Sequence, residues 1–246
     1  MTLRPQTRTV PSWLTQWEYA HRSLHSVGIP ENSLEAAKLA VKAGLGIECD
    51  IQLSLDSKAM VFHDWELDRL TGKSGFTDEF TRSELEKLPL QATNHTIPSF
   101  STFLNEVAAA VPILIEIKSK PGYAVEQTCE RVAEELKAYS GDCAVMSFDP
   151  RTPQWFRKNA PETVCGLVMR EDEFGHTQTA KQREAALMQA EPDFLAYHIA
   201  ALPNPWVRSL RDCGLPILTW TVNSSQEREI ALEHADALIA EGEGLE

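Results

Sequence analysis

Short apolar segments alternate with helix-like patterns along most of this chain, and that alternation limits the folds open to it. Strands are predicted at eight ranges: 17–21, 46–53, 112–118, 143–148, 164–169, 194–199, 216–222 and 236–240. Helical patterns fill the gaps, at about 33–44, 99–110, 124–139, 151–159, 178–190, 204–213 and 225–234. Repeated strand–helix units of this number predict an α/β fold with a closed parallel sheet, the TIM (β/α)8 barrel. An open doubly wound sheet is the alternative, and the absence of a Gly-rich phosphate loop disfavours it.

Two parts of the pattern depart from plain strand–helix repetition. A ninth apolar run, 59–63, follows the strand at 46–53 after only Leu55-Asp56-Ser57-Lys58. Four residues cannot hold a crossover helix, so we predict either a hairpin arm or an extension beside the second strand. After the last strand only six residues remain. The usual final helix is therefore expected to be missing or to be provided by the segment Pro11–Trp17.

Residues 64–98 are too long and polar for an ordinary loop between a barrel strand and its helix. They contain Gly72, Gly75, Pro89 and Pro98. A long insertion at the carboxyl end of a barrel strand lies over the mouth of the active site. We therefore expect one domain over residues 1–246, with a small insertion subdomain at about 64–98 after the second strand region.

Composition limits the partners and the compartment. The chain has 246 residues, and its formal charge of −13 argues against nucleic acid as a partner. Its five cysteines are scattered without a CxxC motif, as in a reduced cytoplasmic protein. The polar segment Met1–Val10 is not a signal peptide, and no apolar run approaches the roughly 20 residues of a membrane span. We expect a cytoplasmic protein with a small-molecule partner and no integral membrane segment; whether it forms a homo-oligomer is open.

Charged side chains stand within otherwise apolar strands. Glu48 and Asp50 are one residue apart, so both point to the same face of their strand. Two carboxylates on one face repel each other unless a cation lies between them, and hard divalent ions prefer such oxygen ligands. The apolar residues on the opposite face, among them Cys49, indicate that the strand is buried.

A second strand carries a similar pair. Glu116 and Lys118 share the face opposite three isoleucines. Burying charges in such a strand is costly unless they form a site or a salt bridge within the barrel, and both interpretations remain open. His21-Arg22 and His63-Asp64 also lie at the ends of apolar runs. A lone histidine there is usually structural, but the neighbouring charges favour a functional role.

Taken in order, these motifs resemble those of the glycerophosphodiester phosphodiesterase family. The resemblance covers nearly the whole chain and runs through His21-Arg22, Pro30-Glu31-Asn32, Glu48-x-Asp50, His63-Asp64, Leu67-x-Arg69-x-Thr71-Gly72, Ile97-Pro98-Ser99-Phe100, Ile115-Glu116-Ile117-Lys118, Ser147-Phe148 and Trp220-Thr221-Val222-Asn223.

The resemblance implies a TIM barrel that hydrolyses glycerophosphodiesters to glycerol phosphate and an alcohol. It implies a divalent ion, Ca²⁺ or Mg²⁺, and a pair of histidines as general acid and base. Histidines suit this chemistry because they titrate near neutral pH, and the charge of a phosphodiester must be offset before a nucleophile can approach. The attacker in this family can be the substrate's own glycerol hydroxyl, which gives a cyclic phosphate that water opens. The implied residues are His21 and His63 for proton transfer, Glu48, Asp50 and Glu116 for the metal, Arg22 and Lys118 for the phosphate, and Glu31 in support.

Several assignments stay open at this point. Asn32, like Glu31, either supports the site or only caps the next helix. Trp220 is either a core residue or a platform for the substrate. Two other histidines, His25 and His198, are expected to approach the mouth. The remaining functional alternatives are a phospholipase-like or other phosphodiesterase on the same barrel, and a non-catalytic member that binds a phosphodiester.

The chain also departs from the family pattern in two places. Ser23 stands where a glycine usually follows His-Arg, and it is expected to crowd or hydrogen-bond near the phosphate. Ile239-Ala240-Glu241 stands where the family tends to have Thr-Asp. We expect that change to alter the bottom of the barrel and part of the pocket wall without touching the metal ligands.

Overall fold

The computed structural model describes residues 9–245, which form two compact units. One unit is the continuous segment Arg22–Asp142. The other combines the chain up to His21 with the chain from Cys143 onward.

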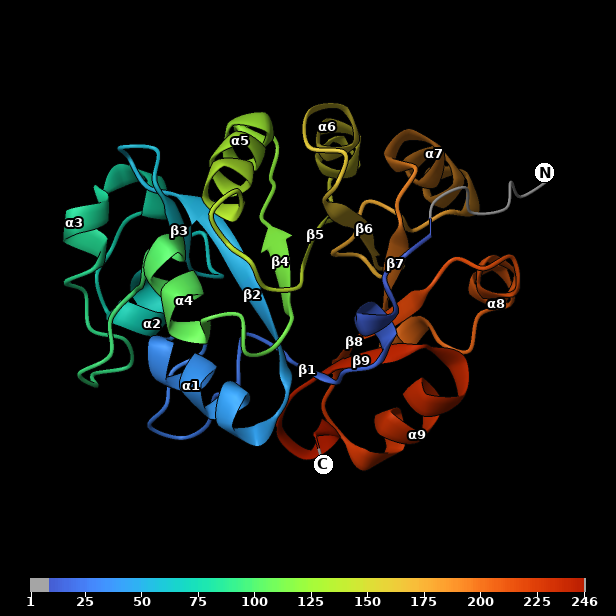
Figure 1. Cartoon of the computed structure of the whole chain (residues 1–246), viewed down its shortest axis with the longest axis horizontal. Coiled ribbons are helices and arrows are strands. Elements are labelled where there is room, and N and C mark those ends of the chain that lie inside the picture. The colour runs from blue at the N-terminus through green and yellow to red at the C-terminus, as the bar shows by residue number, and fades with distance from the viewer. Residues whose placement is uncertain (1–8, 246) are drawn as a thin grey trace. The chain divides into compact units, whose positions relative to one another are not determined.

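The Arg22–Asp142 unit is built around the long strand β2 (Gly46–Leu53), all eight residues of which are buried. Figure 1 shows β2 beside β3 (Ala59–Val61) and β4 (Ile113–Ile117). β3 pairs antiparallel with β2, so the predicted hairpin arm is confirmed. β4 pairs parallel with β2 and sets Asp50 level with Glu116.

Three helices of this unit follow the expected ranges: α1 (Leu34–Ala43), α4 (Phe100–Val107) and α5 (Val125–Leu136). α1 begins where the Ser33 side chain accepts a hydrogen bond from the Ala36 amide, and it ends at Gly44. Gly44 has a φ of +70°, a left-handed conformation that favours glycine. The helix cap is thus Ser33, which leaves the side chains of Glu31 and Asn32 available for other contacts.

The predicted insertion, 64–98, contains short elements rather than an open loop. These are α2 (Asp68–Thr71), the 3₁₀ helix η2 (Thr77–Glu79) and α3 (Arg82–Leu85). They pack around a small apolar cluster formed by Met60, Phe62, Leu67, Leu70, Leu85, Leu90 and Ile97. That cluster gives the segment a core of its own. The single domain over 1–246 stays a prediction.

The second unit contains six parallel strands in the order β1, β9, β8, β7, β6, β5. Their bounds are β1 (Tyr19–Ala20), β5 (Cys143–Ser147), β6 (Val164–Met169), β7 (Phe194–His198), β8 (Ile217–Val222) and β9 (Ala237–Ala240). Ala20 is level with Ala240, and His198 is level with Trp220. Because all the pairings are parallel, the residues that follow these strands lie along one edge of the sheet.

Helices α6 (Arg151–Asn159), α7 (Ala180–Ala190), α8 (Pro205–Asp212) and α9 (Ser225–His234) connect these strands (Figure 1). The 3₁₀ helices of this unit are η1 (Ser12–Thr15), η3 (Ile199–Ala201) and η4 (Gly242–Gly244). Of the expected Pro11–Trp17 segment, only η1 is helical.

Within residues 9–245, eight strands join the parallel ladders and alternate with helices, as expected. The fold class is the TIM barrel that the sequence predicted. In that same range, every helix is too short or too polar to cross a lipid bilayer.

Candidate active site

Three buried carboxylates gather on β2 and β4. Glu48, Asp50 and Glu116 each place a ligand oxygen within 4.8 Å of the other two, and they are only 2%, 2% and 8% exposed. Lys118 lies 3.2 Å from Asp50 Oδ1 and 2.9 Å from Glu116 Oε1, measured from Nζ. Glu116 and Lys118 therefore form the salt bridge that was one of the two interpretations. Lys118 also contacts Asp50, so it is part of the same cluster.

The electrostatics of this cluster leave it short of positive charge. Burial raises the pKa of Glu48 well above its usual range, and repulsion from Asp50 and Glu116 adds to the effect. Burial also disfavours ionised Asp50, but Lys118 and other nearby positive groups hold its pKa below the usual range. Three carboxylates with so little compensation, all oxygen donors, fit a hard divalent ion.

Arg22 and its neighbours hold the acidic cluster from one side. The Arg22 amide donates to Glu48 Oε2 at 2.8 Å, and its Nη1 donates to Glu31 Oε1 at 2.8 Å. Asn32 Nδ2 donates to Asp50 Oδ2 at 2.9 Å, and Asn32 Oδ1 accepts from the Asp50 amide at 3.3 Å. The interpretation of Glu31 and Asn32 as mere helix caps is wrong, because their side chains contact charged site residues instead.

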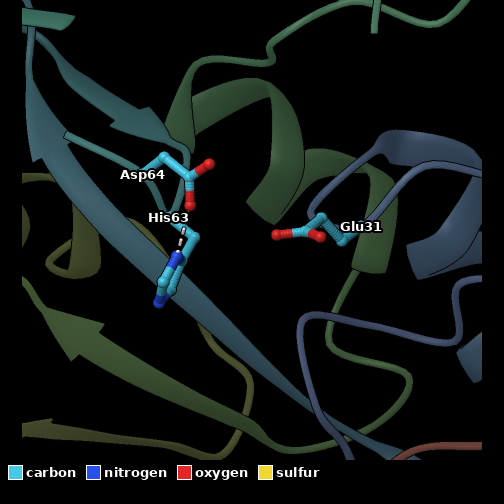
Figure 2. A group of neighbouring side chains, drawn as sticks. All are labelled: Glu31, His63 and Asp64. Carbon is cyan, nitrogen blue, oxygen red and sulfur yellow. Dashed lines mark hydrogen bonds and ion pairs between the residues drawn. The ribbon is translucent and has the colours of Figure 1, made fainter. Parts of the chain in front are cut away.

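His63 is held by a carboxylate and by a second arginine behind it. Its Nδ1 lies 2.8 Å from Asp64 Oδ1, the contact dashed in Figure 2. Arg69 of α2 donates from Nε to Asp64 Oδ2 at 2.5 Å and from Nη2 to Asp64 Oδ1 at 2.9 Å. The same guanidinium donates to both Glu31 oxygens, at 2.9 and 2.8 Å. The sequence showed Arg69 only as part of a motif, and gave it no role.

Figure 2 shows Glu31 facing His63 and Asp64, and these three groups are spaced closely enough to hold an ion. Cationic partners already serve both carboxylates, however. The pKa of Arg69 is raised by its hydrogen bonds to Glu31 and Asp64. The pKa of Asp64 is lowered: burial opposes this, but the bonds from His63 and Arg69 outweigh it. This cluster is thus neutralised by arginine, unlike the cluster of Glu48.

His21 belongs to the second unit and follows β1. Its amide donates to the Ala240 carbonyl at 2.8 Å, and its Nδ1 lies 2.6 Å from Glu241 Oε2. In the tautomer that carries its proton on Nδ1, His21 donates a hydrogen bond to Glu241 and leaves Nε2 as the nitrogen able to exchange a proton. Glu241 follows the carboxyl end of β9 and contacts His21 there. The expected effect on the bottom of the barrel and on part of the pocket wall stays a prediction.

Trp220 lies on β8 and is partly exposed. Its Nε1 donates to the Ala196 carbonyl at 3.1 Å. Its ring lies 5.3 Å from that of Phe148 and 4.9 Å from that of His198. A partly exposed indole beside other rings is suited to contact a ligand. One of those rings is that of His198, at the end of β7.

The predicted site residues thus fall into two groups. In the Arg22–Asp142 unit the structure brings together Arg22, Glu31, Asn32, Glu48, Asp50, His63, Glu116 and Lys118, with Asp64 and Arg69 as additions. His21 and Trp220 belong to the other unit, together with Glu241.

Comparison with known proteins is consistent across sequence and structure. Residues 21–239 match the sequence model of the glycerophosphoryl diester phosphodiesterase family. A glycerophosphodiester phosphodiesterase of Caldanaerobacter subterraneus is 27% identical over 220 residues, which are 85% of this chain and 87% of that protein. The crystal structure of the Thermotoga maritima glycerophosphodiester phosphodiesterase superposes with a TM-score of 0.73 at 27% identity, covering 90% of this chain and 92% of that one. An Oleispira antarctica phosphodiesterase, solved with its product sn-glycerol-3-phosphate, gives a TM-score of 0.80 at 23% identity and shares the fold over 91% of this chain and 92% of that one.

Proposed function

Because the chain belongs to the glycerophosphoryl diester phosphodiesterase family and is a phosphoric diester hydrolase, we propose that it hydrolyses glycerophosphodiesters by divalent-metal-dependent acid–base catalysis. The products are glycerol phosphate and an alcohol. The observation that best supports this proposal is the buried triad of Glu48, Asp50 and Glu116, whose like charges are costly without a further cation.

Those three carboxylates would hold the ion, either Ca²⁺ or Mg²⁺. When bound, such an ion offsets negative charge on the phosphate oxygens and polarises the phosphorus centre. Arg22 and Lys118 lie beside the triad and offer guanidinium and ammonium donors. They would offset the rest of the negative charge on the phosphate oxygens. Glu31 keeps the Arg22 guanidinium in place through its 2.8 Å hydrogen bond.

His21 and His63 perform the proton transfers in this proposal. The Nδ1 atom of His21 contacts the carboxylate of Glu241, and the Nδ1 atom of His63 contacts that of Asp64. In both rings, Nε2 is therefore the nitrogen that takes up or gives the proton. One imidazole takes the proton of the attacking hydroxyl. The other, as imidazolium, gives its proton to the departing alkoxide.

The attacking group is a hydroxyl of the substrate's glycerol moiety. Its oxygen forms a new bond to phosphorus as the bond to the alcohol oxygen breaks, and a cyclic glycerol phosphate results. Water then adds to phosphorus and opens the ring, while the histidines exchange their roles. The two steps together consume one water and return both histidines to their starting protonation states.

Metal removal and restoration test the proposal. Treatment with excess chelator should abolish hydrolysis of glycerophosphocholine or glycerophosphoethanolamine, and Mg²⁺ or Ca²⁺ should restore it. Glu48→Gln, Asp50→Asn and Glu116→Gln should each prevent that restoration while thermal unfolding remains cooperative. Full activity in chelator would refute the metal role.

Histidine variants separate proton transfer from metal binding. His21→Ala and His63→Ala should each lower kcat by roughly 10²–10⁴-fold with little change in metal affinity. The double variant should lose less than the product of the two losses, because the two histidines act as a unit in the same reaction step. A near-normal rate in His63→Ala would contradict the assignment, and binding of substrate without any turnover would favour the non-catalytic alternative.

A substrate panel tests the glycerol requirement. Glycerophosphodiesters should be better substrates than bis-nitrophenyl phosphate or oligonucleotides, because the synthetic diester lacks the internal hydroxyl. A better rate with the synthetic diester would leave a metal phosphodiesterase but remove the glycerol preference.

A further inference from the structure

Gln52 is a buried polar residue of β2 that the proposed chemistry does not use. It stands two positions after Asp50, on the strand that carries two of the three proposed metal ligands. It is only 1% exposed. Burial of an amide is costly unless its hydrogen bonds are made, so the partners of this side chain show what holds it there.

The amide of Gln52 donates to three consecutive backbone carbonyls. Gln52 Nε2 lies 3.0 Å from the oxygen of Phe62, 3.1 Å from that of His63 and 2.6 Å from that of Asp64. Because all three partners are acceptors, the nitrogen of the amide must face them. A primary amide has two N–H bonds, so the three oxygens share them. The chain from Phe62 to Asp64 therefore curls around this one nitrogen.

These hydrogen bonds begin where the sheet ends. β3 ends at Val61, so the carbonyls that follow lie beyond its ladder with β2. The Phe62 amide still donates to the Asp50 carbonyl, at 3.0 Å. Backbone carbonyls that are removed from water need donors, and Gln52 supplies them from the neighbouring strand. The backbone of His63 is thereby fixed to the strand that carries Asp50.

His63 is thus held at two places. Asp64 Oδ1 lies 2.8 Å from its Nδ1 and orients the ring. Gln52 holds the backbone from which that ring projects. A group that transfers a proton must come within hydrogen-bond reach of the reacting oxygen, and a misplacement of about 1 Å can cost about 10²-fold in rate.

We infer that Gln52 is a positioning residue for the acid–base chemistry and that it acts on the reaction through His63. The inference rests on the proposed function, in which His63 transfers a proton. Loss of the Gln52 amide should therefore lower kcat while the imidazole of His63 is present. It should have no further effect once that imidazole has been removed.

A double-mutant cycle of Gln52→Met with His63→Ala tests this, with metal-loaded enzyme and glycerophosphoethanolamine as substrate. Methionine has a similar length and no N–H donor in its side chain. Gln52→Met alone should lower kcat roughly 10–100-fold and change KM by less than about twofold. In the His63→Ala background, the same substitution should change kcat by less than about twofold, because the group that it positions is gone.

Gln127→Met is the matched control. Gln127 is an exposed glutamine of α5 in the same unit, and its Nε2 donates to Ser57 Oγ at 3.1 Å. Its substitution should leave kcat and KM unchanged. Thermal unfolding scans show which variants fold. If Gln52→Met does not fold, Gln52→Asn replaces it in the cycle: it keeps the amide but is one methylene too short to reach all three carbonyls, so it should lower kcat in the same His63-dependent way.

The outcomes separate this inference from the proposed function. Absence of turnover of every glycerophosphodiester by the wild-type protein would overturn both. A normal kcat in folded Gln52→Met would overturn the inference and leave the function standing. The same would follow from an equal fold-loss of kcat with and without the His63 imidazole, because Gln52 would then support the fold in general and not this histidine.

Discussion

At the residue scale, Ser23 occupies a backbone position that favours glycine. Its φ of +69° lies in the left-handed region, which L side chains adopt at a cost of roughly 1–2 kcal/mol. Ser23 is 1% exposed, and its hydroxyl has no hydrogen-bond partner among the described residues. The strain is a property of the backbone; the expected crowding or hydrogen bonding near the phosphate stays a prediction.

Ser23→Gly should stabilise the protein by about 1 kcal/mol, because it removes both the strain and the unpaired hydroxyl. For a chain of this length that corresponds to a rise in Tm of roughly 2–4 °C in calorimetry. Ser57 is the control, since it too has a positive φ, of 56°, but its hydroxyl accepts a bond from Gln127. Ser57→Gly should gain less, and a lower Tm for Ser23→Gly would contradict the argument.

Glu241 is the second residue whose role depends on geometry. If it orients His21, Glu241→Gln should lower kcat roughly 10–100-fold while KM changes little, because the neutral amide stabilises an imidazolium less than a carboxylate does. Glu241→Ala should lose more, since alanine offers no acceptor for Nδ1–H. Steady-state kinetics of both variants check this, with exposed Glu243→Gln as the control. Equal activity of the Gln and Ala variants would exclude a positioning role.

At the scale of elements, the short helix α2 links the insertion to the site through Arg69. Its guanidinium binds the carboxylate of Asp64, which contacts His63, and also the carboxylate of Glu31. Glu31 in turn accepts a hydrogen bond from Arg22. A planar fork is needed for this arrangement, and a lysine ammonium cannot reproduce it.

Arg69→Lys should therefore both lower kcat, through Asp64 and His63, and raise KM, through Glu31 and Arg22. We expect a loss of roughly 10²-fold in kcat/KM, and partial rescue of Arg69→Ala by added guanidinium salt. Arg82→Lys is the control, because Arg82 lies in α3 of the same insertion and pairs with Glu86. If neither the kinetic loss nor the rescue is observed, Arg69 does not position the site residues and forms only a surface ion pair.

The elements differ in how far the sequence predicts them. β4 is predicted well because it is a nearly continuous apolar run, as buried parallel strands are. β2 is predicted well because its apolar residues alternate with polar ones. α3 has a local signal, a capping box of Thr81 and Glu84. The four-residue helices α2 and α3 were nevertheless not predicted, because helices this short depend on packing, here of Leu70 and Leu85 in the apolar cluster. For the same reason Glu241 and Arg69 gained roles only from the structure: their partners lie 220 and 38 residues away in the chain.

At the scale of the whole molecule, one buried carboxyl away from the site affects stability against pH. Glu135 of α5 has an oxygen that is buried without a hydrogen-bond partner among the described residues. Burial raises its pKa to about 7, although Arg82 and Lys58 oppose the shift. A folded pKa above the unfolded one means that its favourable contribution is present below about pH 4.5 and is lost as the pH rises through about 7.

Glu135→Gln keeps the shape of the side chain and removes the ionisation. Its Tm should exceed the wild-type Tm at pH 8, and the difference should shrink on going to pH 5. Differential scanning calorimetry at the two pH values measures this. Glu134→Gln, next in sequence and 62% exposed, should show no such trend. A difference that grows towards acid pH would have the wrong sign for the argument.

β1 pairs with β9, which lies near the other end of the chain, so this pairing can form only late in synthesis. His21 is synthesised early, but the strand that receives β1 and the carboxylate that meets His21 come more than 200 residues later. Closing so long a separation must wait for the late residues to exist, and it is among the slower kinds of contact to form. During translation, therefore, the nascent chain can contain every proposed metal ligand and both histidines while one histidine still lacks its partner. Hydrolytic capacity would then begin only when synthesis of the barrel is complete, so the topology itself delays the activity.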